Sequence, residues 1–108
     1  MTFQEYQSFA KSTAIYPQDQ GLAYVALGLC GEAGEISNKV KKIIRDDHGR
    51  LTIEKQNLLA DELGDLCWYI ASMASELGLD LEVIHLNNMN KLKSRQERQK
   101  LSGSGDLR

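Results

Sequence analysis

The sequence has little of what would direct a protein to a membrane, to nucleic acid or to an oxidising compartment. No apolar run approaches the roughly 18 residues that a membrane span requires. A formal net charge of -2 argues against a binder of duplex nucleic acid, which would carry a broad basic surface. The two cysteines, Cys30 and Cys67, form no CxxC pattern, and no secretory signal opens the chain. We therefore expect reduced thiols in a cytoplasmic protein that binds neither membrane nor nucleic acid.

Strand alternation and internal repeats are also lacking, and the only proline is Pro17. The 108 residues suit one small domain, whose core would gain from burial against a second copy. Capping patterns at Thr2, Thr52 and Asp80, with Gly78 as a terminator, mark the helix ends. The predicted class is all-α: a four-to-five-helix chain that forms a four-helix-bundle core completed by oligomerisation. Helices are expected over about 2–12, 20–45, 52–77 and 80–101, within a single domain over 1–101 and before a flexible Gly/Ser-rich tail over 102–108.

The two central helices carry apolar residues at alternating spacings of four and three, which is typical of a coiled-coil-like bundle. Cys30 and Cys67 each follow a residue of this seam, so we expect both thiols to be buried as small hydrophobic groups. The seam consists of Leu29, Ala33, Ile36, Val40 and Ile43 in one helix, and of Leu59, Leu63, Leu66, Ile70, Met73 and Leu77 in the other.

Each central helix also carries two carboxylates one position before seam residues, namely Glu32 with Glu35, and Glu62 with Asp65. If the helices pack antiparallel, the two acid pairs face one another, and like charges then raise each other's pKa. A divalent cation between them would stabilise the arrangement, and all-oxygen ligands suit Mg²⁺ or Mn²⁺. Because Mg²⁺ often shares its ligands with substrate phosphates, the pattern suggests a site for a phosphate-bearing substrate.

A solvated helix face is the alternative, because a single E-x-x-E on a helix usually has that role. The matched second acid pair argues for the metal site. So do Gly31, Gly34 and Gly64, since glycine weakens a helix but lets another helix or a phosphate approach the backbone.

Three separated motifs give a more specific indication. GEAGEI (31–36) and DELGDLCWY (61–69) resemble the MazG-like nucleotide pyrophosphohydrolases, part of the all-α NTP pyrophosphohydrolase superfamily, whose signature is E-x-x-E followed after a variable gap by E-x-x-D. NMNKLKSR (88–95) resembles the N-x-x-K-L-x-x-R segment of their last helix. The resemblance spans roughly residues 20 to 97, so the domain over 1–101 is identified as MazG-like.

The resemblance implies both a reaction and a set of residues. Family members cleave nucleoside triphosphates between the α- and β-phosphates, giving a monophosphate and pyrophosphate, and they work as homodimers or as homotetramers built from dimers. We take Glu35 as the first candidate for the carboxylate that accepts a proton from the attacking water. The positions that match the family's Mg²⁺ ligands are Glu32, Glu35, Glu62 and Asp65, and those that match its phosphate-binding segment are Asn88, Lys91 and Arg95.

The remaining polar and aromatic candidates are less specific. Lys39 lies one turn after Glu35 and either pairs with it or reaches a phosphate, and Tyr69 could hydrogen-bond substrate or groups around the metal. Trp68 is expected to pack between helices rather than to stack on a base. In this superfamily the base pocket is built partly from the first helix and partly from a neighbouring chain, so position alone suggests Phe3, Gln4, Gln7 and Tyr16.

Other functions stay open at this point. A ferritin-like di-iron protein would need E-x-x-H pairs, and no histidine is suitably placed. A non-catalytic helical dimerisation module would explain the apolar seams but not the acid pairs. A hydrolase of the same superfamily acting on another phosphoanhydride, such as phosphoribosyl-ATP, would share every motif. The basic residues of the last helix also fit a solvated helix end that complements the helix dipole.

Overall fold

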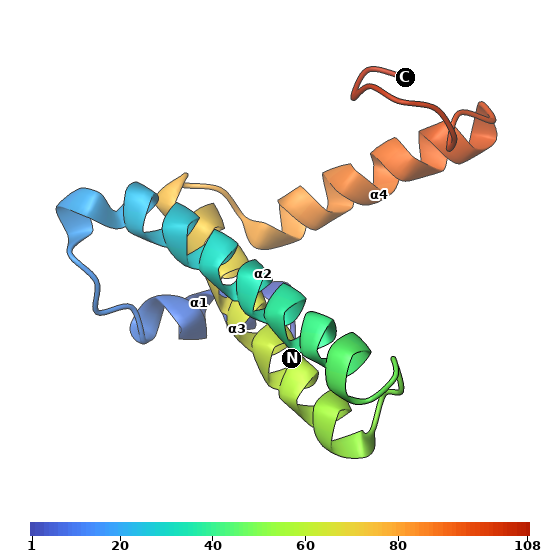
Figure 1. Cartoon of the computed structure of the whole chain (residues 1–108). Coiled ribbons are helices and arrows are strands. Elements are labelled where there is room, and N and C mark those ends of the chain that lie inside the picture. Colours follow the sequence, from blue (N-terminus) through green and yellow to red (C-terminus); the bar gives the residue numbers. More distant parts are fainter.

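The computed structural model describes residues 1–108 as four α-helices and one short 3₁₀ helix, without strands (Figure 1). The predicted all-α class is confirmed. None of the helices combines the length and the apolar character needed to cross a membrane. In chain order the elements are α1 (Phe3–Ser12), η1 (Gln18–Gln20), α2 (Gly21–Asp46), α3 (Ile53–Glu76) and α4 (Leu81–Glu97).

The helix starts follow the predicted caps. Thr2 and Glu5 form a complete capping box, in which the Glu5 N–H donates to Thr2 Oγ1 at 3.1 Å and the Thr2 N–H donates to Glu5 Oε2 at 2.9 Å. Thr52 caps α3 by accepting a hydrogen bond from the Lys55 N–H, and Asp80 caps α4 in the same manner. Local side-chain chemistry therefore sets where each of these helices begins.

Helices α3 and α4 are each followed by a residue in the left-handed conformation. Gly78 follows α3 with φ of +67°, as predicted, because glycine adopts this conformation without strain. The predicted end of α4 at Leu101 is wrong, since α4 stops at Glu97. There Gln99 takes φ of +56° and the Lys100 N–H donates to the Arg95 carbonyl at 2.7 Å, which closes the last turn.

Helices α2 and α3 form an antiparallel hairpin, and α1 packs against α3 (Figure 1). Gln7 of α1 fixes the start of α4, because its Nε2 donates to the Leu79 carbonyl and its Oε1 accepts from the Leu81 N–H, both at 2.9 Å. Beyond this start, α4 projects away from the hairpin and does not pack on α2 (Figure 1). The buried core is correspondingly small. One cluster consists of Ala10, Ala71, Ala74 and Leu81, with Tyr6 and Trp68 packed against it, and Val25 and Ile43 are the other buried apolar residues.

Only part of the predicted apolar seam is buried between α2 and α3. Ile43 is buried and Ile36 is half-buried, but Ala33 and Val40 are exposed. The contact stripe is rotated toward the acidic side of each helix, so polar side chains share it with the apolar ones. The prediction that both thiols are buried is wrong for the same reason. Exposed residues on the unburied side of the seam include Cys30, Ala33, Val40, Leu63, Cys67, Ile70 and Leu77.

The single chain is more open than a compact monomer of its size. Its accessible surface is 8224 Å², whereas a folded monomer of this mass exposes about 6,000 Å². Its radius of gyration is 16.9 Å, against about 13 Å for a compact domain of equal length. The excess surface is therefore on the order of 2,000 Å², and it includes much of the apolar seam.

Candidate metal centre

Three carboxylates meet at the α2–α3 interface. Glu32 of α2 lies opposite Glu62 and Asp65 of α3, and each residue offers one oxygen within 4.8 Å of the other two. Glu32 and Glu62 are half-buried in the contact stripe of the hairpin, whereas Asp65 is exposed. The predicted facing of the two acid pairs is thus realised for three of the four residues.

Glu35, the fourth predicted acid, does not belong to this cluster. It lies about one turn further along α2, and its side chain is exposed. Its charge nevertheless contributes to raising the pKa of Glu32, so it is an electrostatic neighbour of the three clustered acids. Its roles as a metal ligand and as a proton acceptor stay predictions.

The pKa of the Glu32 carboxyl is raised above its ordinary value. Partial burial is the main cause, followed by a hydrogen bond with the Glu62 carboxyl and by the negative charges of Asp65, Glu62 and Glu35. Such a carboxyl retains its proton more readily unless a cation lies nearby. This donor set fits a hard divalent cation, because it provides three carboxylate oxygens from two helices and no nitrogen or sulfur ligand.

Lys39 adds one protein cation to the cluster. Its Nζ lies 3.0 Å from Glu62 Oε1, and this hydrogen bond is the main cause of the raised pKa of Lys39. The expected partner was Glu35, on the same helix, so that prediction is corrected. Lys39 lies in the contact stripe and faces α3, so its ammonium group pairs with Glu62 of that helix rather than with Glu35 of its own helix.

Tyr69 lies beside the acids and against the backbone of Gly28. A Cβ added to Gly28 would overlap the Tyr69 ring, so this glycine provides the space that the ring occupies. Burial is the main cause of the raised pKa of Tyr69, followed by its contact with Tyr24 and by the charges of Glu32 and Asp65. In contrast, a Cβ added at Gly31, Gly34 or Gly64 would meet no atom of another helix within 4 Å. The expected close approach of a second helix to these glycines therefore does not occur within one chain.

A cavity of about 390 Å³ adjoins the acid cluster. The sequence predicts packing for Trp68 and hydrogen bonding to substrate or to groups around the metal for Tyr69. It assigns no role to Thr13, which follows the end of α1. Aromatic residues one or two helical turns from the acids were the available signal. The lining residues are Thr13, Glu32, Asp65, Trp68 and Tyr69.

The predicted phosphate-binding segment lies elsewhere in the single chain. Asn88 and Lys91 are exposed on α4, which projects away from the α2–α3 hairpin (Figure 1). Arg95 is only 6% exposed, and its Nη2 donates to the Asp106 carbonyl at 2.8 Å. The structure therefore does not bring these three residues to the acid cluster within one chain.

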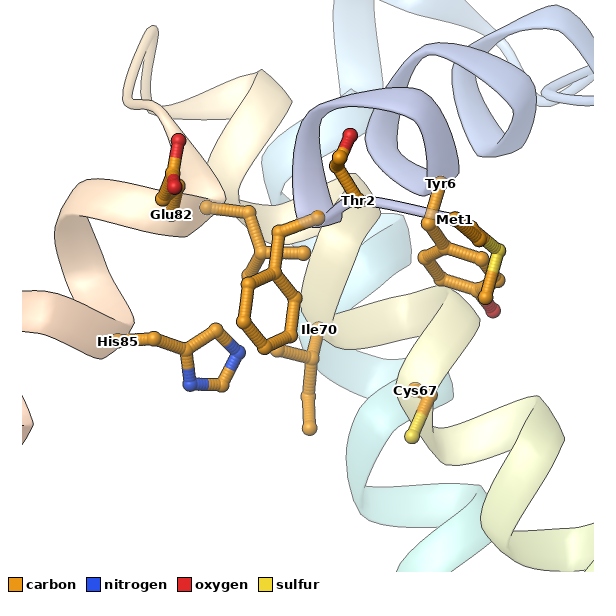
Figure 2. A pocket seen from close by; sticks show the side chains of 9 residues that line it. Met1, Thr2, Tyr6, Cys67, Ile70, Glu82 and His85 are labelled. Atoms are coloured by element: carbon orange, nitrogen blue, oxygen red, sulfur yellow. The ribbon is translucent and has the colours of Figure 1, made fainter.

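The residues suggested for the base pocket lie in different parts of the structure. Gln7 is engaged with the start of α4, and the Tyr16 hydroxyl donates to Glu76 Oε1 at 2.6 Å. Phe3 stacks on His85, with ring centroids 4.3 Å apart, beside a separate apolar cavity of about 510 Å³. Figure 2 shows His85 of α4 and Ile70 of α3 facing this second cavity, which contains no member of the acid cluster.

The sequence pattern of the MazG nucleotide pyrophosphohydrolase domain matches residues 20–99, which include all three clustered acids. The chain belongs to the MazG family. The MazG match covers both acid motifs and the N-x-x-K-L-x-x-R segment, as the motifs predicted.

A relative from Mycobacterium phage L5, named "Gene 37 protein", is 50% identical over 109 residues. The alignment covers 95% of this chain and 96% of the phage protein, so the two proteins correspond over nearly their whole length. The name of the relative states no activity. No solved structure matches the chain.

Proposed function

We propose that the chain is a Mg²⁺-dependent nucleoside triphosphate pyrophosphohydrolase, which cleaves NTP or dNTP between the α- and β-phosphates to a monophosphate and pyrophosphate. The observation that carries the proposal is the group of Glu32, Glu62 and Asp65, whose oxygens lie within 4.8 Å of one another across two helices. Membership of the MazG family supports the reaction class, nucleotide pyrophosphohydrolysis.

In this proposal Glu32, Glu62 and Asp65 hold the cation, with Mn²⁺ as a possible substitute for Mg²⁺. The bound ion would neutralise phosphate charge and lower the pKa of a water. Glu35 lies about one helical turn from Glu32 on the same helix, from where it would complete the ligand set or accept the proton of the attacking water. Its exposed side chain has the freedom for such a role.

Basic residues would bind the phosphates. Lys39 would exchange its contact with Glu62 for one with a phosphate oxygen, as a single ammonium charge. Arg95 would exchange the Asp106 carbonyl for two phosphate oxygens, since a guanidinium binds them bidentately. Asn88 and Lys91 point from α4, so we propose that these α4 residues serve a site that is completed in a homodimer or a homotetramer.

The exposed apolar seam supports assembly with a second copy. An excess on the order of 2,000 Å² per chain over a compact monomer exceeds the about 800 Å² per partner that a stable interface of standard size buries. Val40, Leu63 and Ile70 are 40%, 53% and 37% exposed on the unburied side of the seam. A two-fold pair would let the hairpins of two chains bury these residues against each other.

The experiment that tests the reaction measures pyrophosphate release from NTPs and dNTPs with Mg²⁺, with Mn²⁺ and with a chelator. The proposal predicts release with either ion and none with the chelator. Glu62→Gln should abolish it while the helical circular dichroism spectrum is preserved. Glu54→Gln is the matched control, because Glu54 is exposed in the first turn of the same helix and lies outside the cluster. Full activity of Glu62→Gln would refute the role assigned to the cluster.

A further inference from the structure

The cavity beside the acids joins two kinds of wall. Glu32 and Asp65 bring carboxylates to one part of it, and Trp68 and Tyr69 bring aromatic rings to another. Its volume of about 390 Å³ falls in the range of about 300–1,000 Å³ that is usual for small-molecule sites. A site for a cation alone has no use for an aromatic wall. With a divalent cation on its carboxylates, the cavity would fit a ligand that has both an anionic part, bound through the cation, and a planar part.

The indole ring of Trp68 is fixed in this wall by several contacts. Its Nε1 donates to Thr13 Oγ1 at 2.7 Å, and the Thr13 hydroxyl in turn donates to the Ala10 carbonyl at 2.8 Å. The Tyr69 ring meets the indole edge-on, with centroids 5.0 Å apart and planes at 84°. Trp68 is therefore held in one orientation, while its side chain is still only half-buried. An aromatic face that is fixed in advance loses little conformational entropy when a ligand stacks on it.

We propose that this cavity, here called the Trp68 cavity, receives the base and sugar of the nucleotide, with the base stacked on Trp68 and the phosphates directed to the acid cluster. The inference rests on the proposed function, because it assigns the triphosphate to the acids. It goes beyond that function by making Trp68 and Thr13 part of the substrate site.

The same wall offers little basis for distinguishing one base from another. The Thr13 hydroxyl already donates to Ala10 and accepts from Trp68. Every base has a π face, and stacking on an aromatic ring is accordingly tolerant of base identity. We therefore infer that the stacking contribution of Trp68 is similar for purine and pyrimidine nucleotides.

Trp68 is the only tryptophan in the chain, so its fluorescence reports on the proposed contact. The wild-type protein is titrated in Mg²⁺ with an α,β-methylene nucleoside triphosphate, which resists cleavage at the scissile bond, and separately with inorganic tripolyphosphate. The expected result is that the nucleotide analogue quenches Trp68, whereas tripolyphosphate does not. Analogue binding that is detected calorimetrically without any change in Trp68 fluorescence would overturn the proposal.

Variants give a second, independent readout. Trp68→Leu should raise KM for an NTP about 5- to 100-fold, and Trp68→Phe, which keeps an aromatic face, should restore most of the loss. Thr13→Val keeps the shape of the side chain but removes the acceptor of the indole N–H, so KM should rise there as well. Phe9→Leu is the control, because Phe9 is 65% exposed and does not line the cavity. Wild-type KM in a folded Trp68→Leu protein would overturn the proposal.

The two proposals fail in different ways. Quenching by the analogue without pyrophosphate release from any NTP would refute the reaction and support the Trp68 cavity. Pyrophosphate release with an unchanged KM in Trp68→Leu would refute the cavity and support the reaction. If Trp68→Leu does not fold, the wild-type fluorescence titration still decides, because it changes no residue of the chain.

Discussion

Lys39 on α2 places its ammonium nitrogen 3.0 Å from Oε1 of Glu62 on α3, so the acid cluster includes a cation supplied by the protein. This ion pair links the two helices at the point where their carboxylates meet. A divalent ion bound by Glu62 would compete with Lys39 for the same oxygen. The affinity of the acid cluster for a divalent ion should therefore depend on the charge of Lys39.

The first prediction concerns that competition. Lys39→Met removes the ammonium group, so Mg²⁺ should bind the acid cluster more tightly than in the wild type, as measured by isothermal titration calorimetry. If Lys39 also binds a phosphate, the same variant should release pyrophosphate more slowly. Lys41→Met is the matched control, because Lys41 is exposed and forms no ion pair. Weaker Mg²⁺ binding by Lys39→Met than by Lys41→Met would contradict the competition.

The second prediction is that alanine at two glycine positions of α2 has opposite effects on stability. Gly28→Ala would drive its methyl group into the Tyr69 ring, so unfolding should become easier by about 1–3 kcal/mol. Gly31→Ala meets open space within the chain and should stabilise α2 by about 0.5–1 kcal/mol. Chemical denaturation of both variants measures the difference. Destabilisation by Gly31→Ala at protein concentrations where the chain self-associates would indicate that a second copy packs there.

The helix pattern and the acid positions could be predicted because both depend on local sequence. Caps at Thr2, Thr52 and Asp80 fix the helix starts, and the antiparallel hairpin brings together three of the four acids with matched offsets. The side of the seam that becomes buried could not be predicted in this way, because it depends on how α2 and α3 rotate against each other. That rotation exposes the two thiols and pairs Lys39 with Glu62.

The position of α4 was equally beyond sequence reasoning. The N-x-x-K-L-x-x-R segment identifies the helix, but the direction in which it leaves α3 is set by the turn at Gly78 and by the hydrogen bonds of Gln7. Likewise, Thr13 lines the same cavity as Glu32 and Asp65 only because α1 packs on α3. Contacts between distant segments decide both features.

The third prediction is a dependence of stability on pH. The pKa of Glu32 is raised in the folded chain, so the folded state holds this proton more tightly than the unfolded state does. Its contribution to stability is therefore complete below the unfolded pKa and is lost as the pH rises through the folded pKa. A glutamine at this position does not ionise, so Glu32→Gln should not lose stability as the pH rises. In the presence of a chelator, the Tm of Glu32→Gln should therefore exceed that of the wild type at neutral pH.

Thermal unfolding from about pH 4 to pH 8 checks this sign in the wild type and in Glu32→Gln. The difference in Tm between the two proteins should grow as the pH rises, and Mg²⁺ should reduce it by stabilising the wild type alone. Two Tm curves that run parallel over the whole range would show that Glu32 has the same pKa in both states.

The fourth prediction concerns assembly. Leu63→Glu places a charge on the unburied side of the seam, where a second copy would have to desolvate it, so the oligomer should dissociate. Sedimentation velocity measures the change in mass. Ile15→Glu is the control, because Ile15 is 98% exposed in the link before η1 and should leave the mass unchanged. An identical oligomer in both variants would exclude the seam as the interface.

The most direct measurement is the identity of the first products. A nucleoside triphosphate is incubated with the chain and Mg²⁺, and the phosphorus products are followed by ³¹P NMR, with Glu32→Gln and Asp65→Asn as the cluster variants. We predict nucleoside monophosphate and pyrophosphate in equal amounts, with a rate at least about 100-fold lower in each variant. Nucleoside diphosphate and orthophosphate as the only first products, or full activity in both variants, would contradict this prediction.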